Sequence, residues 1–137
     1  MRSKKVLVLA AVLLAALAGG GWYYVRANPS KSKPAPQPTI IHAGEFVTNL
    51  LPNGPYRYIR VEVDVEVDTK EGATKFAERS SQAKDTILRV LRSKKWEDVL
   101  GSQGMEQLAS EMKEQLSKVI APDGSVTRVF FTQFVVQ

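Results

Sequence analysis

The sequence predicts an α+β domain that follows a single N-terminal transmembrane helix and a Pro-rich linker. Three observations predict this organisation. Residues 6–25 are apolar and uncharged, and prolines recur at positions 29, 34, 36 and 38. In residues 40–137, the spacing of apolar residues changes from the alternation typical of strands to helical periodicity and back. Residues 40–137 are expected to run strand, strand, helix, helix, strand, with the helices on one face of a small antiparallel or mixed sheet.

Composition and charge exclude several kinds of site. The chain has no cysteine and one histidine, His42, which rules out disulfides, thiolate zinc sites, cysteine nucleophiles and multi-histidine metal sites. Residues 1–33 hold six basic residues and no acids, whereas residues 34–137 hold 13 basic and 14 acidic residues. The net charge of +5 therefore belongs to the N-terminal segment, and a basic groove for nucleic acid is not supported.

Residues 6–25 form the predicted membrane anchor. Twenty residues at about 1.5 Å of rise each span about 30 Å, which is the thickness of the hydrocarbon core. Arg2, Lys4 and Lys5 should hold residues 1–5 in the cytoplasm, so the remainder lies outside. The anchor residues are the apolar positions of the helix and the aromatic cluster at its far end: Val6, Leu9, Leu13, Leu17, Trp22, Tyr23 and Tyr24.

The alternative for this segment is a cleaved signal peptide, because Ala16-Leu17-Ala18 fits a cleavage site before Gly19. The apolar run continues past Ala18 and ends in aromatic residues, which favours retention. Both interpretations place residues 40–137 outside the cytoplasm. Residues 26–39 are predicted to be an extended spacer with a reach of about 40 Å, although Pro-rich segments also serve as ligands for groove-bearing domains.

The first two elements of the domain are strands. In residues 58–68, Ile59 and four valines alternate with charged residues, which predicts a strand with one buried and one solvated face. Residues 45–51 are a shorter strand candidate, and the turn signal Pro-Asn-Gly-Pro at 52–55 predicts a hairpin between the two.

The periodicity then becomes helical. A helix is expected from about residue 73 to residue 92, followed by a short helical turn over 96–100 and a second helix over 104–120. Pro122-Asp123-Gly124 ends this helix, and residues 126–136 are the last strand. In that strand we expect Phe130 and Phe134 to share one face and Phe131 to lie on the other, as a contact residue.

The acidic side chains of residues 58–68 are the main candidates for chemistry: Glu62, Asp64, Glu66 and Asp68. Alternate strand residues lie about 6.5–7 Å apart, a separation that suits an inverting glycoside hydrolase. A regular strand makes an open ridge rather than a cleft, however, and a calcium loop would need glycine where Thr69 stands. The preferred interpretation is a solvated face balanced by Arg57, Arg60 or Arg128, with no catalytic residues and no metal.

The closing motif RVFFTQFVVQ at residues 128–137, behind a membrane helix and a linker, resembles the flagellar basal-body FliL family. Further motifs in family order are FVTNL at 46–50, YIRV at 58–61, KDTIL at 84–88, LRSK at 91–94 and GMEQL at 104–108. The matching positions singled out are Asn49, Leu50, Tyr58, Arg60, Asp85, Leu88, Gly104, Leu108, Val129, Phe131, Phe134 and Gln137.

This resemblance implies a non-enzymatic scaffold of the bacterial flagellar motor in the cell inner membrane, without cofactors. It implies a periplasmic domain similar to the stomatin/prohibitin (SPFH) type that forms homo-oligomeric rings. Such proteins associate with stator units and support torque, swimming and swarming motility.

On this basis we hypothesise that the solvated strand face from Arg60 to Asp68 meets a basic surface on a neighbouring subunit. Its possible interface residues are Glu62, Asp64, Glu66, Asp68 and Phe131. The alternatives are a generic anchored scaffold unrelated to flagella and a small carboxylate-dependent hydrolase.

Overall fold

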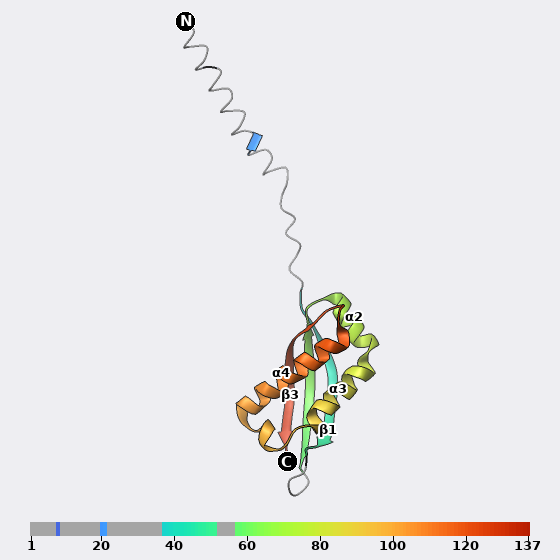
Figure 1. Ribbon diagram of the computed structural model, residues 1–137, viewed down its shortest axis with the longest axis vertical. Helices are drawn as coiled ribbons and strands as arrows, with labels where there is room; N and C mark the ends of the chain where they lie inside the picture. Colours follow the sequence, from blue (N-terminus) through green and yellow to red (C-terminus); the bar gives the residue numbers. More distant parts are fainter. Residues whose placement is uncertain (1–7, 9–19, 22–36, 52–56) are drawn as a thin grey trace. The chain divides into compact units, whose positions relative to one another are not determined.

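The computed structural model describes residues 8, 20–21, 37–51 and 57–137 (Figure 1). The chain divides between Ala35 and Pro36 into two units, and the unit that ends at Gln137 contains the fold described below. The predicted cytoplasmic residues 1–5, nearly all of the predicted anchor and most of the linker lie outside the described residues.

Among the residues that the structure describes, no helix has the length and apolar character needed to cross a bilayer.

An antiparallel sheet with the order β1-β2-β3 forms one layer of the C-terminal unit. Its strands are β1 (Thr39–Asn49), β2 (Tyr58–Val67) and β3 (Val126–Val136). Strand β2 is buried on one face, as its alternating sequence predicted, because the inward side chains of Ile59 and the four valines have no exposed surface. The predicted α+β class and the pairing of β1 with β2 are therefore confirmed.

Strand β1 begins at Thr39, six residues earlier than the pattern predicted. The register of β1 against β2 shifts between His42 and Gly44, and Gly44 adopts a φ of 126°. A bulge inserts one extra residue and breaks the period of two, so the first half of the strand shows no regular alternation in the sequence.

The helices are α2 (Lys70–Glu78), α3 (Ser80–Arg92), the 3-10 turn η1 (Glu97–Val99) and α4 (Gly101–Ile120). The single helix predicted over 73–92 is thus two helices that meet at Arg79. The Arg79 guanidinium donates a hydrogen bond to the Val119 carbonyl oxygen at 2.6 Å, which ties this junction to the end of α4. Thr69 caps α2 by accepting from the Gly72 N–H at 3.0 Å.

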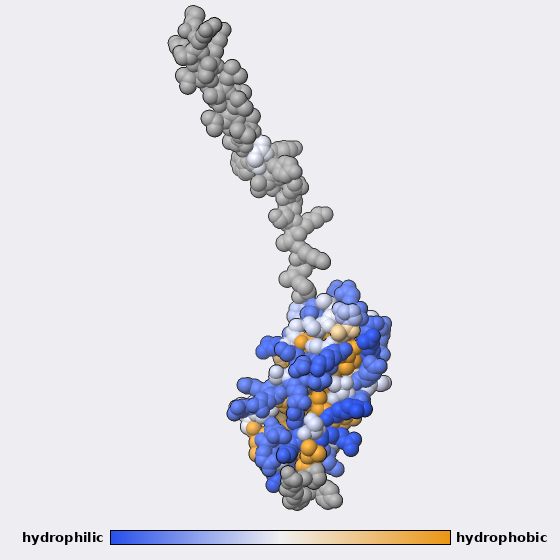
Figure 2. All heavy atoms as spheres, viewed as in Figure 1, coloured by the Kyte–Doolittle hydropathy of each residue, from blue (hydrophilic) through white to orange (hydrophobic). Residues whose placement is uncertain are grey.

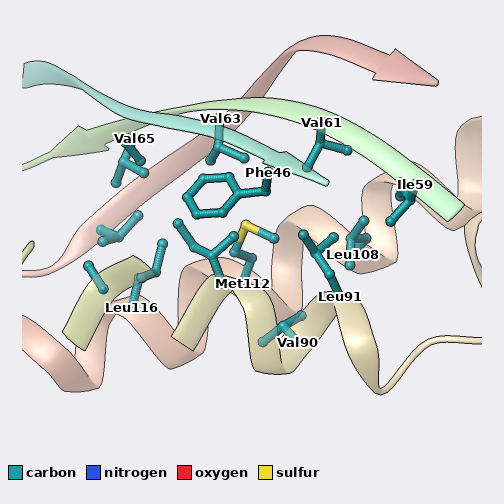
Figure 3. Packing of buried hydrophobic residues seen from close by; sticks show 14 of the residues in the cluster. Phe46, Ile59, Val61, Val63, Val65, Val90, Leu91, Leu108, Met112 and Leu116 are labelled. Atoms are coloured by element: carbon teal, nitrogen blue, oxygen red, sulfur yellow. The ribbon is translucent and has the colours of Figure 1, made fainter. Parts of the chain in front are cut away.

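The core lies between the sheet and the helices (Figure 3). Phe46 and the valines of β2 point towards Leu91 of α3 and towards Leu108, Met112 and Leu116 of α4. These α4 residues recur every four positions and have almost no exposed surface, as expected for the buried stripe of an amphipathic helix. The face of the unit that α4 crosses is mainly hydrophilic, with hydrophobic residues visible between the charged ones (Figure 2).

Candidate functional site

The outer face of the sheet is the candidate site, because the helices described pack on the opposite face. The outward side chains of β2 alternate with its buried valines and carry Arg60, Glu62, Asp64 and Glu66. Both neighbouring strands add exposed side chains to this face, including Ile40 and Val47 of β1, which are 61% and 52% exposed. An exposed sheet face of charged and apolar groups offers a contact surface rather than a pocket.

His42 lies between two carboxylates of the acidic row. Its Nδ1 is 2.8 Å from an oxygen of Asp64, and its Nε2 is 3.8 Å from an oxygen of Glu62. The His42 side chain is 59% exposed and the Asp64 side chain 26%. His42 and Asp64 are register partners on β1 and β2, so the sheet itself holds this group in place.

Glu66 and Asp68 have hydrogen-bond partners near the start of β3. The Thr127 hydroxyl donates to Glu66 Oε1 at 2.6 Å. The Ser125 N–H donates to Asp68 Oδ1 and the Ser125 hydroxyl to Asp68 Oδ2, both at 2.8 Å. The hydrogen bond from the Ser125 N–H holds the pKa of Asp68 below its ordinary value.

The predicted row of four carboxylates is therefore a row of three on the open face. Asp68 lies after the last residue of β2 and uses both carboxylate oxygens within the fold. The alternation that predicted the row continues through Asp68 in the sequence, but the strand does not.

The three basic residues expected to balance the negative charge of this face have different partners. Arg60 Nε is 3.0 Å from Glu45 of β1, and Arg128 lies opposite Glu66 in the register of β2 and β3. Arg57 instead lies over the ring of Trp96, with its guanidinium carbon 3.9 Å from the ring centroid.

The prediction for the aromatic residues of β3 is wrong. The register shifts between Phe131 and Gln133, so Phe131 and Phe134 face the same side and pair with Val63 and Val61. Their ring centroids are 5.4 Å apart, and both pack against the core. Phe130 is the outward ring and lies opposite Asp64, with the Arg128 guanidinium carbon 5.3 Å from its centroid.

The carboxylates of β2 lie on the open face of the sheet. Among the described residues, no three His, Asp or Glu side chains are grouped closely enough to hold a metal ion. A shallow hollow of about 270 Å³ lies between α3 and α4, lined by Thr86, Arg89, Val90, Ser93, Glu111 and Gln115. It includes none of the carboxylates of β2, so it supplies no cleft for a pair of them.

Several residues singled out by motif have structural positions that explain them. Leu50 and Leu108 belong to the core, Leu88 and Val129 pack against it, and Asp85 pairs with Arg89 at 2.7 Å. The Tyr58 hydroxyl donates to the Gln137 side chain at 2.5 Å, and the backbones of these two residues exchange hydrogen bonds. Asn49 is an exposed residue at the end of β1.

Sequence reasoning missed the contact of His42 with Asp64 and the role of Ser125. Both depend on which residues of different strands face each other, which a single sequence does not reveal. The only available signal for Ser125 was its place directly after the turn Pro122-Asp123-Gly124.

The comparisons with known proteins agree with the motifs. The family of the flagellar basal body-associated protein FliL matches residues 40–137. The flagellar protein FliL of Aquifex aeolicus (strain VF5) is 26% identical over 92 residues, which cover 67% of this chain and 56% of that protein. The chain thus spans little more than half the length of this relative. Because the family match covers more than half of the chain and the whole of the sheet beyond its first residue, the chain belongs to the family of the flagellar basal body-associated protein FliL.

Proposed function

We propose that this protein is a non-enzymatic, membrane-anchored scaffold of the flagellar basal body that associates with the stator units. The observation that carries the proposal is the family match over residues 40–137, which includes the specific closing motif of β3. Through this association the protein supports stator engagement, torque and motility.

The geometry of the sheet supports a contact role. Glu45, Glu62, Asp64 and Glu66 lie on the outer face, where Arg60, Arg128 and His42 offset them only in part. Strand residues hold their positions without the ordering cost that a loop would pay on binding. The partner that fits this face is a basic segment of a neighbouring subunit or of a stator unit.

The N-terminal sequence supports a periplasmic location for this face. Residues 6–25 have the length and composition of an inner-membrane anchor, and residues 26–39 have the composition of a spacer. An SPFH-type ring of such domains, held at a set height above the membrane, would surround or flank a stator.

A fluorescent fusion at the N-terminus tests this proposal and leaves the closing motif of β3 intact. The full-length fusion is imaged in living cells together with labelled stator units and flagellar bases. We expect foci that coincide with flagellar bases and change when the stator units are deleted. Uniform membrane fluorescence that is indifferent to stators would overturn the flagellar role and favour a generic anchored scaffold.

A further inference from the structure

Within residues 37–51 and 57–137, both outer strands of the sheet have an edge without a strand neighbour, since β1 and β3 each pair only with β2. Just past the end of β1, Leu51 forms an isolated bridge with Lys95. An edge strand presents a row of N–H and C=O groups that can pair with another strand. The register shifts at Ala43 and Thr132 leave two regular segments at the same end of the sheet, Gly44–Asn49 of β1 and Gln133–Val136 of β3.

The edge of β3 is weakly protected against pairing. Across Val126–Val136 the strand carries one charged residue, Arg128, which lies at the other end from Gln133–Val136. The inward side chains of Phe131, Phe134 and Val136 are half-buried, whereas the inward side chains of β2 are fully buried. The helical layer therefore covers β3 less completely than it covers the centre of the sheet.

The backbone hydrogen bonds at the ends of β1 and β3 show which backbone groups point outward. Tyr58 and Gln137 exchange both bonds, so by the antiparallel alternation the groups of Phe134 and Val136 point away from β2. On β1, the Leu50 N–H donates to Arg57, so the groups of Val47 and Asn49 point away from β2. Among the residues that the structure describes, these outward donors and acceptors have no backbone partner.

The direction of the strands determines how two copies can meet. Strands β1 and β3 run the same way, because each is antiparallel to β2. When the helical layers of two copies lie on the same side of a shared sheet, the β1 edge of one copy therefore meets the β3 edge of the other in parallel. In the same arrangement, two β3 edges that met would pair in antiparallel fashion.

We propose that Gln133–Val136 of β3 pairs in parallel with Gly44–Asn49 of β1 in a second copy of this chain. This inference rests on the proposed function, because it names the surface through which copies of the scaffold meet. Val47 and Val135 both lie opposite Arg60 of β2. If the second copy continues the sheet in the same register, Val135 lies beside Val47 of that copy on the outer face. Val47, which is 52% exposed, then gains an apolar neighbour.

A second copy suits this edge better than an isolated peptide strand. Helix α3 packs on β1, so the second copy brings its own α3 next to the half-buried inward row of β3. An isolated strand would satisfy the backbone groups but leave Phe134 and Val136 half-exposed. The contact joins two different edges and is therefore heterologous, so its repetition builds a closed ring or an open filament.

Disulfide cross-linking in membranes tests the pairing, since the chain has no cysteine of its own. Full-length Val47→Cys and Val135→Cys chains with different tags are produced together and treated with a mild oxidant. Neighbouring strands lie about 4.8 Å apart, which is within the Cα separation that a disulfide bridges. We expect a mixed-tag dimer from this combination.

The controls separate the possible modes of pairing. Ser81→Cys, on the exposed surface of α3, should give no mixed dimer with Val135→Cys. Each of the Val47→Cys and Val135→Cys chains alone should also give no dimer. A dimer from Val135→Cys alone would show antiparallel pairing of β3 and would overturn the proposal, as would the absence of any mixed dimer.

A charge exchange provides a second readout that does not depend on oxidation. Val47→Lys with Val135→Lys in one chain places like charges side by side and should reduce chemically cross-linked oligomers at least several-fold. Val47→Glu with Val135→Lys should restore them, and equal oligomer yields for the two variants would contradict the pairing. Flagellar foci of the unmutated N-terminal fusion are scored in parallel. Foci of an unmutated chain that gives no cross-linked oligomers would refute the edge contact and leave the flagellar role standing.

Discussion

Asp68 joins the end of β2 to the start of β3. Its carboxylate accepts two hydrogen bonds from Ser125, and its own N–H donates to the Ser125 carbonyl at 3.2 Å. Thr69 next to it caps α2 and donates to the Asp123 carbonyl at 2.9 Å. These two residues therefore fix where the sheet ends and where the helical layer begins.

The pKa of Asp68 predicts how stability depends on acid. Because the hydrogen bond from Ser125 lowers the pKa in the folded chain, the ionised carboxylate stabilises the fold above the ordinary carboxyl value. This stabilisation is lost as the pH falls below about 4 and through the lowered pKa. Asp68→Asn should reduce the free energy of unfolding by about 1 kcal/mol above pH 5 and flatten its decline in acid.

Denaturant unfolding of the purified chain between pH 2 and pH 6 measures this effect. Glu106→Gln removes an exposed carboxylate of α4 and serves as the matched control. An acid profile of Asp68→Asn that parallels the unmutated chain would contradict the role assigned to the carboxylate.

Two of the three register shifts on the edge strands decide which side chains face the core. The shift at Thr132 turns Phe131 inward beside Phe134 and leaves Phe130 on the outer face. The shift at Ala43 brings His42 opposite Asp64. Each shift inserts one residue and moves all following side chains to the other face, so a single position decides which ring belongs to the core.

At the level of elements, α4 begins against the turn η1. A Cβ added to Gly104 would lie 2.8 Å from the carbonyl oxygen of Asp98 and 2.8 Å from the carbonyl carbon of Val99. These are backbone atoms, so they cannot move aside as a flexible side chain would. The motif glycine at this position therefore allows a helix and a turn to make close contact.

Gly104→Ala tests this contact. Alanine favours a helix by up to about 1 kcal/mol over glycine, but the new methyl group forces α4 and η1 apart. We expect the free energy of unfolding to fall by about 1–2 kcal/mol in total. Thermal or urea unfolding measures the change, and Gln103→Ala, at the exposed neighbouring position, should have an effect near zero. An unchanged or higher stability of Gly104→Ala would show that the two elements can separate at no cost.

For the whole molecule, the charge of the outer sheet face is the property that the proposed contact uses. Glu62→Lys with Asp64→Lys reverses two side chains that are 40% and 26% exposed, while the core beneath keeps its valines. We expect the double variant to fold but to lose most of its flagellar foci and motility support, because a basic partner would be repelled.

A matched reversal on the other side of the unit controls for net charge. Glu106→Lys with Glu114→Lys changes two exposed residues of α4 by the same four units of charge and should leave foci and swimming intact. Circular dichroism of both variants checks the fold. Normal ring assembly and motility of the Glu62 and Asp64 variant would refute the contact.

Much of the fold follows from local patterns. The alternation in β2 predicted a strand buried on one face, and the apolar stripe of Leu108, Met112 and Leu116 predicted α4. The closing motif of β3 predicted the family, which the family match confirms. Prediction was weaker for β1, which extends to Thr39, and for the break at Arg79, because a bulge and a tertiary hydrogen bond decide these boundaries.

The sequence by itself determined the class of fold, the order of its main elements, the family and the acidic character of the outer face. These depend on composition and on periods of two and 3.6 residues, which are local properties of a chain. The tertiary structure alone decided that Asp68 leaves the acidic row, that Phe131 turns inward, and that β1 and β3 are the outer strands of the sheet. Those features depend on the register and order of the strands. Contacts between residues far apart in the sequence set both, so local patterns do not reveal them.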